Sequence, residues 1–249
     1  NLILKSFLFL LLSLVGVSAQ APYESLLLLS PAVAAACTLN AGNSTNESWE
    51  GSDSLTWTDT GTVDRNAALS GTSPCSGLGS QCLEVNWDGV ATQPYSSWNR
   101  GSLLNSTLYF RFYFIVISES LADLDHNSIF TSGESVTPSV GVMFRVRINQ
   151  ASGALNIDVI TSPSSTTPIN ISIATWYRAE IKYVVNAVGL SEFKLYDSNG
   201  NQVDTTKTWD TGNNWWQYMH VGLPTVDNTK AFRVQVDGLG VDNAGYLGQ

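Results

Sequence analysis

The chain has 249 residues, of which only 13% are charged, and its 21 acidic against 12 basic residues give a formal net charge of −9 at pH 7. This balance argues against nucleic acid as a partner, because phosphate binding needs clustered Lys and Arg. Gly, Ser, Thr and Asn are frequent between short β-branched and aromatic runs, which is typical of turn-rich β proteins.

Residues 1–19 have the pattern of a signal peptide, and they predict a secreted protein that is extracellular or at the cell surface. Lys5 precedes an apolar run over 7–17, and Val17-Ser-Ala19 supplies small residues for cleavage. An apolar run of about eleven residues is too short to span a bilayer comfortably. Two alternatives are a retained membrane anchor and a strand that stays in the mature protein and packs against a neighbouring subunit.

Residues 20–44 form a second apolar segment, with Ser25-Leu-Leu-Leu-Leu-Ser30 followed by an Ala-rich run that ends at Cys37. One interpretation is a first or edge strand of the domain, with Cys37 as a small buried apolar residue. The alternative is self-association through residues 21–37, donated as a strand to the next copy in an extracellular filament or coat. The run also resembles a lipidation site at Cys37, although the usual Leu three residues earlier is absent.

Cys75 and Cys82 lie in Pro74-Cys-Ser-Gly-Leu-Gly-Ser-Gln-Cys82, where two glycines let the chain fold back. In an oxidising compartment we expect these two cysteines to form a disulfide. A loop this short would stabilise the fold by about 2.5 kcal/mol in the chain-entropy model. Metal binding by the same pair lacks further Cys or His nearby, and Cys37 is left free or intermolecular.

Most of the chain after Trp49 alternates apolar and polar residues, which predicts half-buried antiparallel strands. Such strands fit two antiparallel sheets stacked with their apolar faces inward, and no window shows sustained helical periodicity. Asp197-Ser-Asn-Gly200 supplies the positive φ angles of a tight hairpin turn. The clearest predicted strands cover residues 55–57, 83–87, 108–114, 142–148, 155–159, 176–183, 193–196 and 232–236.

Five runs occur in a characteristic order: LYFRFYF (108–114), FRVR (144–147), TWYRAEIK (175–182), FKLYDSNG (193–200) and VDGLGVDNAGYLG (236–248). In this order they resemble the concanavalin A-like lectin/glucanase superfamily, in its laminin G-like branch. The resemblance covers about residues 45–249 and implies an all-β, two-sheet antiparallel jelly-roll sandwich. It implies binding of glycans or proteins, or cleavage of polysaccharides, and the fold does not choose among these.

The enzymatic motifs of this superfamily are absent from the sequence, which favours a non-catalytic protein. The β-glucan-cleaving branch carries Glu-x-Asp-x-x-Glu on one strand, and no such triplet of carboxylates occurs. Lyases of related fold use a His and a Tyr with an Arg-rich strand. Arg145, Arg147, Tyr113, His126 and His220 have these types without the motif, so a hydrolase or lyase is the alternative and ordinary solvent-face residues are the simpler interpretation.

The segment from Trp209 to Tyr218 concentrates three tryptophans with amides and a carboxylate. Indole faces stack on pyranose rings while Asn and Asp bind hydroxyls, so the segment predicts a platform for a polysaccharide or a cell-surface glycan. The alternative is that Trp215 or Trp216 plugs the end of the sandwich. The predicted glycan-binding residues are Trp209, Asp210, Asn213, Asn214, Trp215, Trp216 and Tyr218.

The stretch 123–134 places Asp123, Asp125, Asn127 and Glu134 at the spacing of a calcium loop. Ser128 stands where the sharp turn requires Gly, and no flanking helices are predicted. The alternative is therefore a polar surface loop. The laminin G-like resemblance also implies a calcium at a loop edge with a different oxygen set, including Asp237 or Asp242.

Four N-glycosylation sequons begin at Asn43, Asn46, Asn105 and Asn170. All four lie in predicted turns or strand ends, where a glycan is accommodated. In a eukaryotic source we expect at least two of them to be occupied.

Overall fold

The computed structural model describes residues 45–47, 56–71, 80–90, 92–104, 107–161, 165–185, 190–210, 216–226, 229–242 and 245. All of them belong to the second of two compact units, Val33–Gln249, and only this unit is described below. The predicted signal peptide and the apolar segment 20–44, with its proposed self-association, lie outside the described residues. The described part of the chain contains no membrane-spanning helix.

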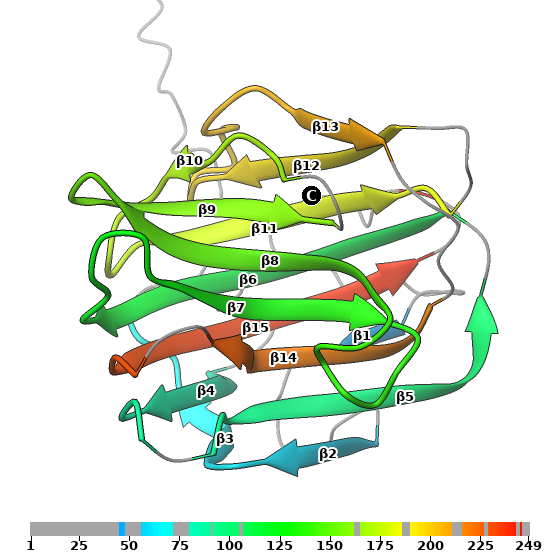
Figure 1. The fold of residues 1–249 in the computed structure, drawn as a ribbon, viewed down its shortest axis with the longest axis horizontal. Coiled ribbons are helices and arrows are strands. Elements are labelled where there is room, and N and C mark those ends of the chain that lie inside the picture. The colour runs from blue at the N-terminus through cyan, green and yellow to red at the C-terminus, as the bar shows by residue number, and fades with distance from the viewer. Residues whose placement is uncertain are drawn as a thin grey trace, which may run out of the picture. The chain divides into compact units, whose positions relative to one another are not determined.

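The described residues form two antiparallel β-sheets, which confirms the predicted sandwich (Figure 1). Sheet A runs in the order β13-β12-β11-β6-β15-β4-β3, with β1 also paired to β15. Its strands are β1 (Thr45–Glu47), β3 (Val63–Ala68), β4 (Gln81–Trp87), β6 (Leu108–Glu119), β11 (Trp176–Tyr183), β12 (Leu190–Tyr196), β13 (Lys207–Asp210) and β15 (Phe232–Asp242).

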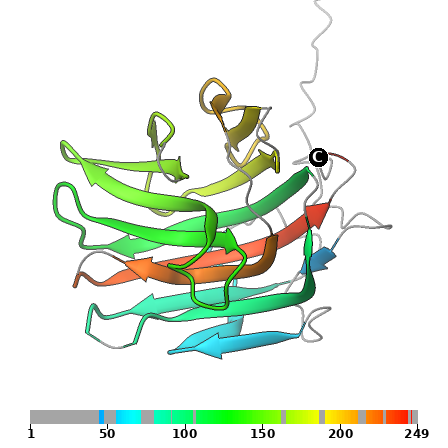
Figure 2. The ribbon, with the colours of Figure 1, turned by 45° about the vertical axis from the view of Figure 1, so that its right-hand side comes forward.

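Sheet B lies in front of sheet A in Figure 1 and runs in the order β10-β9-β8-β7-β14-β5-β2. The turned view of Figure 2 shows the same two layers. Its strands are β2 (Trp57–Thr60), β5 (Tyr95–Leu104), β7 (His126–Gly133), β8 (Val142–Ala151), β9 (Ala154–Ile160), β10 (Ile169–Asn170) and β14 (Trp216–Val226).

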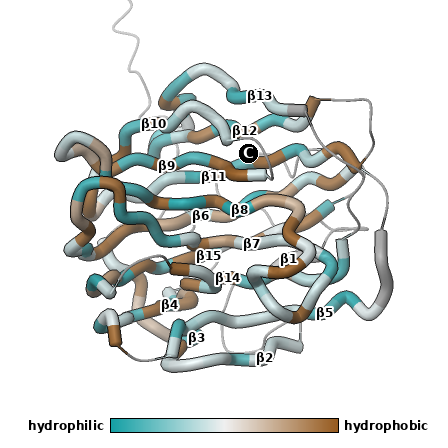
Figure 3. The backbone as a smooth tube through the Cα atoms, in the orientation of Figure 1, coloured by the Kyte–Doolittle hydropathy of each residue, from teal (hydrophilic) through white to brown (hydrophobic). Residues whose placement is uncertain are grey.

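The core lies between the sheets and is rich in phenylalanine. Alternation along β6 sends Phe110 and Phe112 inward, where both are fully buried. The ring of Phe112 stacks on Phe130 of β7 at 5.1 Å, and Phe110 meets Phe144 of β8 edge-on at 5.0 Å. These contacts join the two sheets, and the alternating hydropathy that places the rings is visible along the strands in Figure 3.

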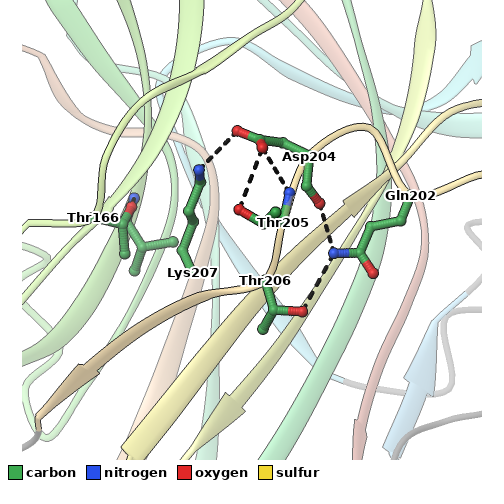
Figure 4. A network of polar contacts seen from close by, with 7 residues as sticks. Thr166, Gln202, Asp204, Thr205, Thr206 and Lys207 are labelled. Atoms are coloured by element: carbon green, nitrogen blue, oxygen red, sulfur yellow. Dashed lines mark hydrogen bonds and ion pairs between the residues drawn. The ribbon is translucent and has the colours of Figure 1, made fainter.

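The predicted turn at Asp197–Gly200 is confirmed, and the chain pairs back across it through one antiparallel bridge, Tyr196 with Gln202. Gly200 has a φ of +81° and its amide donates to the Asp197 carbonyl at 3.0 Å, whereas the next full strand, β13, begins at Lys207. The intervening loop is held by polar contacts (Figure 4). Lys207 Nζ lies 2.7 Å from Asp204 Oδ2, and this hydrogen bond lowers the pKa of the Asp204 carboxyl.

Candidate functional site

A row of polar side chains crosses the outer face of sheet B from β2 to β8. The register pairs Thr58 with Ser97, Ser97 with His220, His220 with Thr131, and Thr131 with Arg145. Directly paired residues share a face of the sheet, and their chain neighbours point the opposite way, into the core. We call this surface, centred on His220, the β14 face.

His220 is the buried centre of the β14 face, with an exposed fraction of 1%. Its Nδ1 lies 2.7 Å from Ser97 Oγ and its Nε2 lies 3.2 Å from the Ser135 carbonyl oxygen. A carbonyl oxygen only accepts, so Nε2 carries the proton and Nδ1 accepts from the Ser97 hydroxyl. Burial lowers the pKa of His220 to about 4, against the opposing effect of the Ser135 hydrogen bond, so the imidazole is neutral at pH 7.

Two tyrosines flank the imidazole on the same face. The ring of Tyr218 stacks parallel to His220 at 6.2 Å, and Tyr95 meets it edge-on at 5.6 Å. The Tyr218 hydroxyl accepts a hydrogen bond from Asn99 Nδ2 at 3.1 Å. Tyr218, which the sequence predicts as a glycan-binding residue, therefore belongs to the β14 face.

A pocket of about 350 Å³ opens beside the β14 face, where Arg145 of the row and the neighbouring Tyr95 both line it. One wall is the loop from Glu134 to Gly141, which in Figure 1 crosses in front of β14 toward β5. The loop is closed at its base by a hydrogen bond of 3.0 Å from the Glu134 amide to the Gly141 carbonyl. The described residues that line the pocket are Gln93, Tyr95, Thr137, Pro138, Ser139, Arg145, Pro224, Thr225 and Val226, among which Arg145 alone is charged.

The structure places two of the three tryptophans of the predicted platform in the hydrophobic core. Trp209 and Trp216 are 6% and 2% exposed, and both belong to the hydrophobic core. Trp216 packs against Trp98 at 5.8 Å and Phe110 at 5.9 Å, so this ring fills the sandwich, as the alternative interpretation had it. Asp210 ends β13, and its side chain is not described. Asn213, Asn214 and Trp215 lie outside the described residues, and their part of the platform stays a prediction.

The predicted calcium segment is not a surface loop, because residues 126–133 form strand β7. Eight residues of strand separate Asp125 from Glu134 by roughly 25 Å, so their carboxylates do not converge. The carboxylates of Asp123 and Asp125 instead accept hydrogen bonds from the amides of Ser152 and Ala122. Ile129 and Phe130 are both buried, through a register shift after Ser128, and Asn127 is buried too. No group of three or more His, Cys, Asp or Glu among the described residues is placed to hold a metal.

The other predicted modification sites are only partly described. Cys82 is fully buried in β4, and its thiol donates to the Ala67 carbonyl at 3.4 Å. Cys75 lies outside the described residues, so the disulfide stays a prediction. Asn170 is exposed in β10, as a glycosylated residue must be. Asn46 lies in β1 with its side chain not described, while Asn43 and Asn105 lie outside the described residues.

The five residues considered for a lyase are brought only partly together. Arg145 and His220 share the β14 face, but Tyr113 is buried on the outer face of sheet A. Arg147 binds both carboxylate oxygens of Asp158, at 3.0 and 2.6 Å, and His126 lies at the far end of β7.

Sequence reasoning missed Tyr95, Ser97, Thr131 and Ser135. The alternation of Tyr95, Ser97 and Asn99 with a buried Ser96 and Trp98 is the signal that marks β5 as a strand. Nothing local marks Ser135, because its contribution is a backbone carbonyl that reaches His220 from a loop.

A second polar cluster lies on the outer face of sheet A and differs in kind from the β14 face. Arg178 pairs in register with Tyr113 on β6 and Tyr196 on β12, and Glu180 pairs with Arg111. Burial raises the pKa of Glu180, while Arg178 and Arg111 oppose this shift. Both arginines interact with the Glu180 carboxylate, which is the pattern of a structural ion-pair cluster.

No protein-family model and no curated protein matches the chain. Solved structures do match it. An endo-β-1,4-glucuronan lyase from the fungus Trichoderma reesei is 12% identical over 81% of this chain and 94% of that chain, with a TM-score of 0.52. The cellulose-induced protein Cip1 is 11% identical over 80% of this chain and 97% of its own, also with a TM-score of 0.52.

A botulinum neurotoxin type C, whose cell entry is described as dependent upon interaction with two ganglioside molecules, is 11% identical over 76% of this chain and 43% of its own, with a TM-score of 0.49. Identities this low establish the fold and nothing finer. The chain has a jelly-roll sandwich fold.

Proposed function

We propose that this is a secreted glycan-binding protein whose ligand, an acidic segment of a polysaccharide, occupies the pocket on the β14 face. The observation that carries the proposal is the lining of that pocket, which combines the Arg145 guanidinium, the Tyr95 ring and several hydroxyls. Secretion is supported by the signal-peptide pattern of residues 1–19.

Arg145 supplies the preference for an acidic ligand. A guanidinium binds a carboxylate through two parallel hydrogen bonds, which fixes the orientation of the sugar as well as its charge. Because the chain carries a net charge of −9, the overall field repels anions, and attraction must come from a local cation such as this one.

The remaining lining suits a sugar ring. Tyr95 offers apolar surface to the C–H faces of a pyranose, Pro138 and Pro224 line the pocket from buried positions, and Thr137 and Thr225 offer hydroxyls. Thr131 lies between His220 and Arg145 in the row, and its buried Oγ1 has no hydrogen-bond partner within the described part of the chain. A buried hydroxyl without a hydrogen-bond partner costs free energy, and a hydrogen bond to a ligand or a water molecule removes that cost. The shared fold of a glucuronan lyase, whose substrate is a uronic acid polymer, agrees with this ligand class.

Calorimetric titration with uronate oligosaccharides and with neutral β-1,4-glucan oligosaccharides tests the proposal. We expect the uronates to bind and Arg145→Gln to weaken their binding about tenfold or more, the loss of a charge-assisted contact. Lys230→Gln removes the same charge from an exposed position outside the pocket, and we expect it to bind like the wild type. Equal binding of neutral and acidic ligands, or equal losses in the two variants, would contradict an acidic ligand in this pocket.

A polysaccharide lyase is the second candidate function, because Tyr95, His220 and Arg145 converge on one face beside the pocket. In such a reaction a base removes the proton next to the uronate carboxyl group, and a cation stabilises the resulting charge. Product formation is followed by the ultraviolet absorbance of the new unsaturated sugar ends. Binding without this absorbance, at high protein concentration and long incubation, leaves the protein a non-catalytic binder.

A further inference from the structure

We propose that Ser97 and His220 are a nucleophile and base that hydrolyse small O-acyl esters carried by the glycan. The natural substrate rests on the proposed function, but the chemistry of the pair does not. Acyl transfer needs a hydroxyl in hydrogen-bond contact with a base, and a third group that orients the base.

All three parts are present on the β14 face. The Ser97 hydroxyl donates to His220 Nδ1 at 2.7 Å, and Nε2 is held at 3.2 Å by the Ser135 carbonyl. The carbonyl fixes the tautomer in which the lone pair of Nδ1 faces Ser97. The first distance lies within the range in which a serine hydroxyl passes its proton to a histidine, and the second is that of a hydrogen bond that orients the base.

The surroundings of Ser97 give an ester a place to bind. The side chain of Ser97 is 9% exposed. On the same face of β5, Ser97 lies between Tyr95, which lines the pocket, and Asn99, which is exposed. Asn99 Nδ2 donates to the Tyr218 hydroxyl at 3.1 Å, so an amide group and a phenol lie two residues along the same face from Ser97. Donors of this type stabilise the oxyanion that develops when the acyl carbon is attacked.

The reaction balances with water as the only co-reactant. Ser97 Oγ bonds to the acyl carbon and its proton passes to His220 Nδ1. The ester C–O bond breaks, and the sugar hydroxyl leaves with that proton. Water then attacks the acyl-serine with Nδ1 accepting its proton, and the carboxylic acid departs while Ser97 regains its hydrogen.

The buried imidazole sets the pH behaviour of this reaction. Because burial holds the pKa of His220 near 4, the neutral base form persists through the physiological range. A base this weak transfers protons slowly at pH 7, so we expect low turnover without the inflection near pH 6.5 of an ordinary histidine.

A fluorophosphonate probe tests the pair without any glycan. We expect one adduct by intact mass, mapped to Ser97 by peptide mass spectrometry, and slow release of p-nitrophenol from p-nitrophenyl acetate. Ser97→Ala should lose both signals, and His220→Gln should lower the labelling rate at least tenfold, in the range that general bases contribute. Ser118→Ala is the matched control, because it removes an exposed serine hydroxyl from β6 on the other sheet, away from His220. Thermal unfolding of each variant establishes that it is folded.

A folded wild-type protein that gains no adduct at Ser97 would overturn the proposal, as would equal labelling in the His220→Gln variant. The uronate titration separates this proposal from the proposed function. Uronate binding without an adduct leaves the glycan-binding function and removes the esterase, while an adduct without uronate binding leaves the esterase and removes the acidic glycan.

Discussion

The guanidinium carbon of Arg178 lies 4.2 Å from the ring centroid of Tyr196, while its Nε lies 3.1 Å from a carboxylate oxygen of Glu180. The three residues occupy the outer face of sheet A, yet Arg178 and Glu180 are only 4% and 7% exposed. A guanidinium that contacts both an aromatic ring and a carboxylate is stabilised where little water reaches it. Removing either the arginine or the glutamate would leave the other charge buried without its partner.

Arg178→Met is expected to lower the free energy of unfolding by about 3 to 5 kcal/mol, because it leaves the Glu180 carboxylate buried without this partner. Urea denaturation at pH 7 measures the loss. Lys182→Met on the same strand is the control, since its ion pair with Glu192 is more exposed and contributes about 0 to 1 kcal/mol. The double variant Arg178→Met/Glu180→Met should recover much of the loss. Similar losses in Arg178→Met and Lys182→Met would contradict a buried pair.

His220 makes stability depend on pH in the acidic range. Its folded pKa of about 4 lies below the ordinary value of 6.5, so the unfolded chain binds more protons between these values and stability rises with pH there. On acidification through this window the wild type should lose about 3 kcal/mol through this group, from the size of the shift. Comparing urea denaturation of the wild type and His220→Gln across the window isolates the contribution, and parallel curves would refute it.

Glu180 is expected to act with the opposite sign. Its pKa is raised in the folded protein, so the folded state binds more protons above the unfolded value of about 4.3. Its contribution to stability is complete below that value and is lost as the pH rises through the raised pKa. Relative to Glu180→Gln, the wild type should therefore become less stable as the pH rises from about 4.3. A relative gain over that range would show that the pairing with Arg178 outweighs burial.

Gly222 is expected to be intolerant of any side chain. Its φ is +114°, and a Cβ there would lie 2.7 Å from Val85 Cγ2 and 3.0 Å from the Pro94 carbonyl. Gly222→Ala should cost about 3 kcal/mol or more, from backbone strain together with overpacking. Gly101, with a φ of +87° and nothing within 4 Å of its Cβ position, isolates the strain, and Gly101→Ala should cost only about 1 kcal/mol. Equal Tm values for the two variants would contradict this account.

The sandwich was predictable because alternation in runs such as Leu108–Phe114 is a local signal of a half-buried strand. The same signal gives no sign that Arg178 and Glu180 of β11 are buried rather than solvated. Alternation reports which residues share a face, and it does not report what covers that face. Trp216 shows the limit for the site, since an indole suits a sugar platform and a core equally well, and packing against Phe110 decides for the core.

The β14 face was beyond sequence reasoning for a different reason. Ser97 and His220 are separated by 123 positions in the chain, and Ser135 contributes only a backbone atom. Their meeting depends on β14 inserting between β5 and β7, which is a matter of topology rather than of any local pattern.

The last two described strands, β14 and β15, lie inside the two sheets rather than at their edges. β14 lies between β7 and β5, and β15 lies between β6 and β4. During synthesis, earlier strands thus leave the ribosome before their central neighbours exist, with open edges facing the gap. Folding must wait for β14 and β15 and join residues far apart in sequence, which makes it slow. Nascent chains halted before Phe232 should therefore remain protease-sensitive and associate with chaperones.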